Sequence, residues 1–452
     1  MSTMEQVEVG KYQPYPEYKD SGVEWVGDMP HHWQTKPAFA AVMDQCIKNS
    51  DGAESNVLSL SYGNIVERDV ENNFGLLPES FNTYQIVNPG DIVLRLTDLQ
   101  NDKRSLRVAR STLRGIITSA YLKLACGDEL DNRYAYRLLH SYDTTKVFYG
   151  MGGGLRQSMK FEDFRRLPFL LPPVEEQRTI AAFLDYETAR IDKLIAQQQR
   201  LIELLKEKRQ AVISHAVTKG LNPDAPMKDS GVEWLGEVPE HWIVAGFKKY
   251  IEPIVDYRGK TPTKTESGVF LVTARNIKNG IIDYSLSEEF ISDDDYEEVM
   301  RRGKPKIGDV LFTTEAPLGE VAQIDNENIA LAQRIIKFRG KSNVLDCSYL
   351  KLFIQSTEFQ QGLMTFATGS TALGIKSDRL SYLKQFVPPL TEQTQIVEAV
   401  KEHSKKYEKL IEVASQAIEH MQERRTALVS AAVTGKIDLR GWAALTKEVS
   451  NG

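Results

Sequence analysis

Apolar residues recur at alternating spacings of four and three along two long segments of the chain. The first segment covers residues 175–217, and its ladder consists of Ile180, Leu184, Ile191, Leu194, Leu201 and Leu205. The second covers residues 391–433, and its ladder consists of Ile396, Val400, Tyr407, Leu410, Ala417 and Met421. This spacing is typical of a helix that packs along a coiled-coil seam. Each segment follows a proline pair, which suits the start of a helix. We therefore predict two long helices.

The two ladders share one register, because matching positions differ by 216 residues throughout. Two helices with the same seam pack most simply on each other, and in a duplicated chain they would run antiparallel about a pseudo-twofold axis. A register that centres Gln198 on Ala414 places the polar rung Glu187 opposite Arg424. The alternative is that such polar rungs face solvent near the helix ends.

The regions before each long helix have a different texture. Short apolar runs at 57–62, 91–96 and 115–125 alternate with turn residues such as Pro89-Gly90, which indicates strands. A helical pattern is visible at 132–147. These regions are predicted to be mixed α/β domains, so the fold class is α+β.

A tryptophan motif shows that the whole plan is duplicated. Residues 19–33, KDSGVEWVGDMPHHW, recur as residues 228–242, KDSGVEWLGEVPEHW, with eleven of fifteen positions identical. We expect Trp25, Trp33, Trp234 and Trp242 to be packing anchors near the helix ends. The predicted order is an N-terminal segment and first domain (1–172), a long helix (173–220), a linker and second domain (221–388), a long helix (389–435) and a C-terminal tail (436–452).

Composition is ordinary, with 41 % hydrophobic and 26 % charged residues. No apolar run approaches the ~18 residues of a membrane span, and the N-terminus lacks the pattern of a secretion signal. The three cysteines have no metal-ligand or disulfide spacing. We therefore expect a cytoplasmic protein. The net charge of −6 is unusual for a protein that wraps nucleic acid, although the distribution of charge matters more than its sum.

The sequence contains no catalytic constellation. Residues 369–377, GSTALGIKS, resemble a phosphate-binding P-loop, but one extra residue separates the last glycine from the lysine. The histidines form no metal-ligand spacing. We therefore expect no catalysis, no metal and no cofactor in this chain.

Basic and polar residues gather in each mixed domain. Arg and Lys contact phosphates, and Arg, Asn and Gln form bidentate contacts with bases. The candidates in the first domain are Gln100, Asn101, Lys103, Arg104, Arg107 and Arg110. Those in the second domain are Tyr257, Arg258, Lys260, Thr261, Lys264, Arg275 and Lys278. Ordinary solvated surface is the competing interpretation for each residue. The two clusters do not align, which is expected of one scaffold that reads two different DNA sequences.

Several of these segments together resemble a known family. The GVEWVG and GVEWLG motifs, GDIVLRLTDLQNDKRSL, DYRGKTP and the two helices headed by PPxxEQ are similar to the DNA-specificity subunit of Type I restriction-modification systems. The resemblance implies a non-catalytic subunit in which each domain reads half of a bipartite double-stranded DNA site. It implies that the helices set the distance between the halves and dock two modification subunits. S-adenosylmethionine, ATP and Mg would belong to the modification and restriction subunits.

The alternative function is a protein scaffold that holds two copies of a partner and does not bind DNA. Salt distinguishes these functions, because binding through Lys and Arg to phosphates weakens steeply as salt rises.

Overall fold

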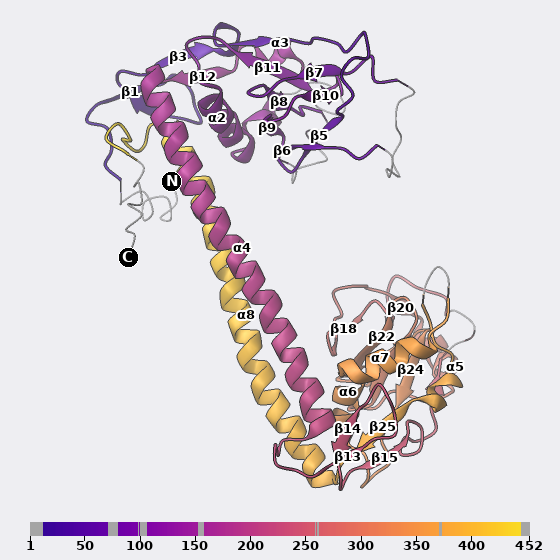
Figure 1. Cartoon of the computed structure of the whole chain (residues 1–452). Helices are drawn as coiled ribbons and strands as arrows, with labels where there is room; N and C mark the ends of the chain where they lie inside the picture. The colour runs from indigo at the N-terminus through magenta and orange to yellow at the C-terminus, as the bar shows by residue number, and fades with distance from the viewer. Residues whose placement is uncertain are drawn as a thin grey trace. The chain divides into compact units, whose positions relative to one another are not determined.

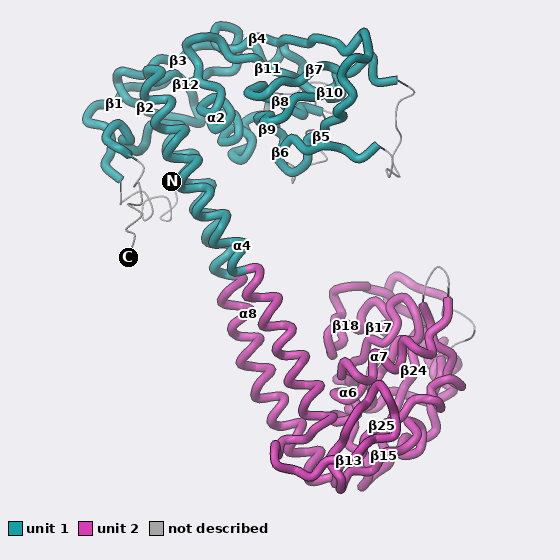
Figure 2. Tube along the Cα trace, in the orientation of Figure 1, with its two compact units in different colours: residues 1–198, 416–452 teal, residues 199–415 magenta. Residues whose placement is uncertain are grey.

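The computed structural model describes residues 12–70, 80–97, 99, 106–151, 158–257, 259, 262–369 and 373–443. Gln100, Asn101, Lys103, Arg104, Arg258, Lys260 and Thr261 lie outside these residues. The chain forms two compact units (Figure 2). Unit 1 contains residues 1–198 and 416–452, and unit 2 contains residues 199–415. Each long helix therefore contributes a part to both units.

The two long helices are α4 (Val174–Lys219) and α8 (Leu390–Val433), as Figure 1 shows. The shorter α-helices are α2 (Asn132–Thr144), α3 (Phe161–Phe164), α5 (Tyr296–Val299), α6 (Cys347–Gln355) and α7 (Thr357–Phe366). The 3-10 helices are η1 (Ala38–Ala40), η2 (Val147–Gly150), η3 (Asp293–Asp295) and η4 (Arg379–Tyr382).

The strands of unit 1 pair in five groups. Four are two-stranded pairs: β1 (Tyr18–Asp20) with β2 (Asp28–Pro30), β3 (Gln34–Pro37) with β12 (Pro168–Leu171), β5 (Leu58–Ser61) with β6 (Asn64–Glu67), and β7 (Gln85–Val87) with β10 (Gly115–Ile117). The fifth is an antiparallel sheet in the order β4 (Val42–Asp44), β11 (Leu122–Cys126), β8 (Ile92–Leu94) and β9 (Val108–Arg110).

Unit 2 repeats most of this plan. Its two-stranded pairs are β13 (Met227–Asp229) with β14 (Glu237–Pro239), β15 (Ile243–Gly246) with β25 (Lys384–Val387), and β18 (Ile277–Lys278) with β19 (Ile281–Ile282). Its four-stranded sheet has the order β16 (Val255–Asp256), β24 (Ile335–Phe338), β21 (Val310–Thr314) and β22 (Leu318–Gln323). Its three-stranded sheet has the order β20 (Phe290–Ile291), β17 (Val269–Val272) and β23 (Ile329–Leu331). The predicted mixed helix and strand class is confirmed.

Both four-stranded sheets bury an ion pair at the same place. In unit 1, Lys123 Nζ lies 3.5 Å from Asp91 Oδ2, and in unit 2, Lys337 Nζ lies 2.9 Å from Asp309 Oδ2. Arg339 adds a second cation to Asp309. Burial alone would raise the pKa of Asp309, but hydrogen bonds from Arg339 and Lys337 outweigh burial and hold that pKa below its ordinary value.

The first turn of each long helix is anchored by one glutamate. In α4, the buried Glu176 accepts hydrogen bonds from the Trp33 indole (2.9 Å) and the Tyr15 hydroxyl (2.5 Å). In α8, Glu392 accepts a hydrogen bond from the Trp242 indole at 3.0 Å. Trp33 and Trp242 are almost fully buried, as expected of packing anchors. Trp25 differs, because it is 45 % exposed and packs edge-on against Tyr142.

The next residue, a fully buried glutamine, joins each helix to its domain. Gln177 accepts a hydrogen bond from the Asp131 backbone N–H at 2.8 Å and donates to the carbonyls of Glu129 and Pro172. Gln393 makes the same three bonds with the second domain, where the backbone N–H belongs to Asp346. The amide oxygen and nitrogen of both buried side chains thus form hydrogen bonds with the backbone.

Each long helix ends on the domain of the other repeat. The Tyr134 hydroxyl of α2 donates to the Val433 carbonyl at the end of α8 (3.4 Å), and the Tyr349 hydroxyl of α6 donates to the Val217 carbonyl near the end of α4 (3.2 Å). Gly435 then turns with φ +72° against Trp33, and Gly220 turns with φ +78° against Trp242. A tryptophan motif thus contacts the start of one helix and the end of the other.

The residues of the predicted seam differ in burial along the two helices. Leu194, Leu201 and Leu410 are 48 %, 43 % and 52 % exposed. Ile180 and Ile396 are buried in the domain cores, as are Leu184 and Val400, and Ala417 is half-buried. In α4 the positions that are buried or half-buried at heptad spacing are 181, 184, 188, 191, 195, 198, 202, 205, 209 and 212, and the corresponding α8 positions lie 216 residues later. Of the predicted seam residues, Leu184, Ile191, Leu205, Val400, Tyr407 and Met421 fit this pattern, and at the other predicted positions the residue that follows fits it instead.

Within each unit one ion pair joins the two long helices. Asp192 of α4 lies 3.0 Å from Arg425 of α8 in unit 1, and Arg209 of α4 lies 3.5 Å from Glu408 of α8 in unit 2. Asp192 and Glu408 occupy equivalent positions 216 residues apart, as do Arg209 and Arg425, so the two ion pairs are equivalent in the two repeats. Glu187, which was expected opposite Arg424, forms an ion pair with Arg190 on its own helix at 2.8 Å.

Further ion pairs join α2 to α4 in unit 1. Arg133 and Arg137 both contact Asp185, at 2.6 and 2.8 Å, and Arg137 also donates to Thr188. His140 lies nearby, stacked on Tyr136. Burial, together with the neighbouring Arg425 and Arg137, lowers the pKa of His140 to about 4.

Replacement of the buried glutamine should destabilise each repeat to a similar degree. Gln177→Ala or Gln393→Ala would leave one N–H and two carbonyls without partners, which costs about 2–4 kcal/mol. We expect chemical denaturation to show this loss for both variants. The exposed neighbour Glu175 provides the control, since Glu175→Ala removes a side chain that makes no bond to the domain. A large loss for only one of the two glutamines would contradict equivalent roles.

His140 should make stability depend on pH. Its folded pKa is depressed, so the unfolded chain binds the proton more readily, and stability should fall as pH drops from about 6.5 to about 4. A pKa lowered from 6.5 to about 4 corresponds to roughly 3 kcal/mol. Denaturation at pH 7 and pH 4.5 should show a smaller difference between the two pH values in His140→Gln than in the parent protein. An equal pH dependence in both proteins would rule out this residue as its source.

Candidate DNA-recognition surface

Arg107, a candidate of the first domain, lies in the protein core. Its side chain is fully buried, and Nη1 donates to the carbonyls of Arg95 (3.1 Å) and Thr97 (2.7 Å). Its backbone N–H donates to the Asp143 carboxylate at 2.6 Å. These contacts hold the end of β8 against α2, so we remove Arg107 from the proposed DNA contacts.

Arg110 is half-buried at the end of β9, where Nε donates to the Asn132 amide oxygen at 2.7 Å. It remains a candidate, because part of its guanidinium reaches the surface. The rest of the first cluster, Gln100, Asn101, Lys103 and Arg104, lies outside the described residues.

In the second domain, Tyr257 also has a structural contact. Its hydroxyl donates to the Gly303 carbonyl, and burial raises its pKa well above the ordinary value. The ring lines a small hollow of about 130 Å³ with the exposed Arg301 and Arg302 at its rim. Lys264 is exposed but forms an ion pair with Glu289 at 2.8 Å. Arg258, Lys260 and Thr261 lie outside the described residues.

A β-hairpin carries Lys278 on its first strand, and the turn that leads into it carries Arg275. Strands β18 and β19 pair through Ile277 and Ile282, and the two-residue loop Asn279-Gly280 has positive φ at both residues (+53° and +86°). This conformation suits a hairpin, because its twist matches that of the strands. Arg275 and Lys278 are both exposed.

Asn276 organises the hairpin from inside, although it was not among the predicted site residues. It is fully buried, accepts hydrogen bonds from the Thr273 N–H and hydroxyl at 2.9 Å, and donates to the carbonyls of Asp283 and Ser287. The Asn-Gly pair that follows is the sequence signal that could have located this hairpin. Single buried asparagines have no periodicity that reveals them.

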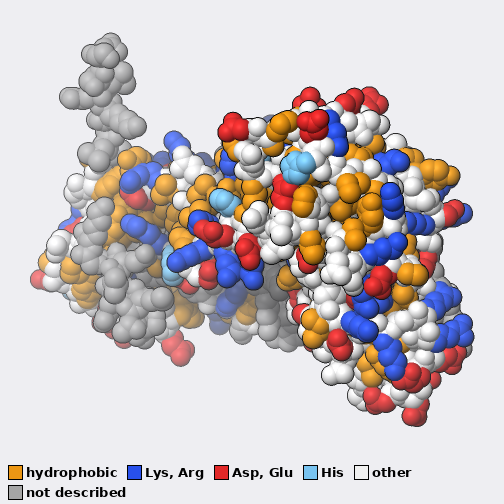
Figure 3. Space-filling model, turned by 90° about the horizontal axis from the view of Figure 1, so that it is seen from below, with side chains coloured by type: hydrophobic (Ala, Val, Ile, Leu, Met, Phe, Trp, Pro, Cys, Tyr) orange, Lys and Arg blue, Asp and Glu red, His pale blue; other side chains and the backbone are white. Residues whose placement is uncertain are grey.

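On one face of the described residues, positive and negative side chains are mixed. Figure 3 shows Lys and Arg side chains interspersed with Asp and Glu on the face that it presents. This distribution agrees with the net charge of −6. Contacts with phosphate would therefore have to come from local groups of cations, such as the hairpin pair.

Other kinds of site find no support among the described residues. No group of three His, Cys, Asp or Glu residues there could hold a metal ion. No helix in this part of the chain is both long enough and apolar enough to span a bilayer. The P-loop-like segment is followed by the short 3-10 helix η4, whereas a P-loop lysine begins an α-helix.

Comparison with known proteins agrees with this architecture. Residues 253–420 match the model of the Type I restriction modification DNA specificity domain. The chain is 26 % identical to the Type I restriction enzyme MjaVIII specificity subunit of Methanocaldococcus jannaschii, over 72 % of this chain and 75 % of that protein. It is 21 % identical to the EcoKI specificity subunit of Escherichia coli K12, over 65 % of this chain and 63 % of that protein.

A solved structure of the type I R-M system contains a chain with the same fold. Its TM-score is 0.66 at 15 % identity, and the match covers 90 % of this chain and 98 % of that one. The relatives are named as specificity subunits, which are the non-catalytic components of their systems. The chain is therefore similar to specificity subunits of Type I restriction-modification systems, and its residues 253–420 match the DNA specificity domain of that family.

Proposed function

We propose that the chain reads a bipartite DNA site, with one half recognised by the domain of each unit. The observation that carries this proposal is that the chain contains the same scaffold twice, whereas the surface loops of the two copies differ. The four-stranded sheets, buried ion pairs and glutamine junctions repeat. The β18–β19 hairpin, with Arg275 and Lys278, has no aligned basic segment in the first repeat. Such a pair of domains suits two different half-sites.

We propose that α4 and α8 form an antiparallel coiled coil that sets the distance between the half-sites. The shared seam, the equivalent ion pairs Asp192–Arg425 and Arg209–Glu408, and the reciprocal helix ends support a pseudo-twofold relation. The 46 residues of α4 correspond to roughly 69 Å at ~1.5 Å per residue, which is about two turns of B-DNA.

The modification subunits are proposed to dock on one side of this helix pair. In unit 2, Leu201, Leu204, Leu410 and Val413 are 43–55 % exposed. Each directly precedes a seam residue, and in an antiparallel pair these positions of both helices lie on the same side. A hollow of about 370 Å³ lies further along the same helices, where Ala211, Val212, Ala399 and Val400 line it together with Lys208, His215 and His403. Exposed apolar side chains grouped in this way mark a protein interface.

In this proposal the partner subunits supply the chemistry. Modification subunits would bind S-adenosylmethionine, and restriction subunits would use ATP and Mg. A complex that acts on DNA in this way would work in the cytoplasm. The alternative, a scaffold that does not bind DNA, predicts an interface insensitive to salt, whereas DNA binding through Lys and Arg weakens steeply as salt rises.

Arg275→Ala should weaken recognition of one half-site only. The side chain is exposed on the second domain, so its loss should cost about 1–3 kcal/mol if it contacts a base. Binding of the assembled complex would be measured with duplexes altered in the first or the second half. The exposed Lys384 on β25 provides the control, as Lys384→Ala removes a cation at the base of the same domain. Equal loss of discrimination at both halves would contradict separate readers. The same selective effect is expected for Arg104→Ala and Arg258→Ala.

Polar substitution of the exposed leucines should weaken assembly. Leu201→Gln with Leu410→Gln removes two apolar side chains that an interface would bury, which should reduce affinity for modification subunits by roughly 10- to 100-fold. Titration by calorimetry would measure this change. The control is Glu203→Gln with Lys206→Gln. These residues directly follow the ladder positions 202 and 205, so they lie on the other side of α4, and their replacement should have little effect. Equal affinities for the two double variants would exclude this side as the docking face.

A further inference from the structure

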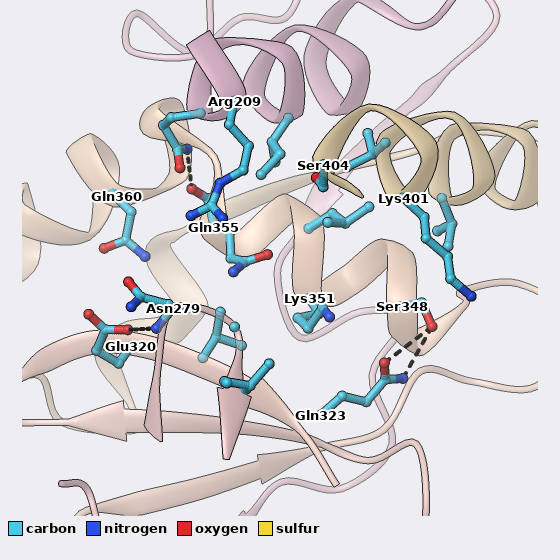
Figure 4. A pocket seen from close by; sticks show the side chains of 18 of the residues that line it. Arg209, Asn279, Glu320, Gln323, Ser348, Lys351, Gln355, Gln360, Lys401 and Ser404 are labelled. Atoms are coloured by element: carbon cyan, nitrogen blue, oxygen red, sulfur yellow. Dashed lines mark hydrogen bonds between the residues drawn. The ribbon is translucent and has the colours of Figure 1, made fainter. Parts of the chain in front are cut away.

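A cleft of about 800 Å³ opens in unit 2 between the second domain and the helix pair. Figure 4 shows its walls. The β18–β19 hairpin contributes Asn279 and Ile281, α6 contributes Lys351 and Gln355, α4 contributes Arg209, and α8 contributes Lys401 and Lys405. Arg209 and Lys351 reach into the cleft from different elements in this view, and Lys401 lies at its edge.

The cleft has an excess of positive charge that the protein does not neutralise. Arg209 is paired with Glu408, and the Glu320 carboxylate accepts a hydrogen bond from the Asn279 backbone N–H at 3.2 Å. Among the described residues, none of Lys351, Lys401 and Lys405 has a carboxylate within ion-pair distance. Three lysines thus line one cavity without an internal counterion.

Lys351 is the least exposed of the three. It is half-buried on α6, and burial lowers its pKa. Keeping an ammonium group in such a position costs free energy unless an anion approaches it. Lys401 and Lys405, at the exposed mouth of the cleft, add to the potential that would attract that anion.

The first repeat provides an internal comparison, because α2 matches α6 at an offset of 215 and α4 matches α8 at 216. Tyr136, Asp185 and Ala189 occupy the positions of Lys351, Lys401 and Lys405. There, Asp185 is neutralised by Arg133 and Arg137, so the interface between domain and helix is closed by internal ion pairs. The shared scaffold therefore does not require lysines at these positions.

The hairpin indicates which anion the cleft meets. The segment that forms one wall of the cleft also presents Arg275 and Lys278 at the surface. A duplex held by these two residues would bring its backbone towards the adjoining lysines. The amides of Gln355 and Asn279 on the walls are suitable partners for phosphate oxygens.

We propose that this cleft binds phosphates of the DNA backbone beside the half-site read by the second domain. The inference rests on the proposed function and adds a set of contacts that contributes affinity without reading sequence. Because the first repeat lacks the three lysines, the two halves of the DNA site would be held with unequal backbone contacts.

The test is the salt dependence of DNA binding by the chain assembled with its modification subunits. The variant combines Lys351→Gln, Lys401→Gln and Lys405→Gln. We expect the slope of log Kd against log salt concentration to decrease by roughly 0.9 for each phosphate that the variant no longer neutralises, and cognate and scrambled duplexes to be weakened by the same factor. A second variant with only the exposed Lys401→Gln and Lys405→Gln keeps Lys351 and tests the proposal if the triple variant folds poorly.

The matched control removes two other lysines from α8. Lys406 and Lys409 do not line the cleft, so Lys406→Gln with Lys409→Gln should leave the slope unchanged. An unchanged slope in the cleft variants, with sequence preference intact, would overturn the cleft proposal alone. No preference for any sequence in the parent complex would instead overturn the proposed function.

Other occupants give distinct results. Calorimetry with pyrophosphate, ATP and a polyglutamate peptide would show whether the parent protein binds a free phosphate compound or an acidic chain. Binding of either that depends on the three lysines, together with an unchanged DNA slope, would assign the cleft to that ligand and overturn the proposal.

Discussion

The fold depends on a carboxylate at the first turn of each long helix, which is buried in α4 and half-buried in α8. Glu176 is desolvated and compensated by the Trp33 indole and the Tyr15 hydroxyl. A buried acceptor of this kind is stable only when its donors are held in place. The tryptophan motif provides a donor, and the same motif receives Gly435 from the other helix. The hydrogen bonds to Glu176 and the packing of Gly435 therefore join the start of α4, the end of α8 and the tryptophan motif, and Glu392 accepts the corresponding bond from Trp242 in the second repeat.

Much of this organisation could be predicted from the sequence, because each pattern occurs twice and the second copy supports the interpretation of the first. The long helices and the mixed domains follow from periodicity and from two copies of one motif. The phase of the seam could not be predicted, because Leu194 and Leu201 are each followed by isoleucine. Either phase gives an apolar ladder, and the choice depends on packing against the partner helix.

The recognition surface was less predictable, since a basic run does not show which cation faces inward. Arg107 belongs to the same basic run as Lys103, Arg104 and Arg110, yet its guanidinium donates to two backbone carbonyls in the core. Arg275 and Lys278 carry the same kind of signal and are exposed in the structure. The unpaired lysines of the cleft come from α6 and α8, which are far apart in sequence, so no local pattern could unite them.

The exchange of helix ends also governs how the chain can fold during synthesis. Unit 2 is a continuous segment, and its internal contacts become available once residue 415 has been made. Unit 1 includes contacts such as that of the Tyr18 hydroxyl with the Gly435 carbonyl, which join residues 417 positions apart. Long-range contacts of this kind form late, because a long loop must close first. The N-terminal domain is therefore synthesised first but completed last, and until then its tryptophan motif lacks the helix end that covers it.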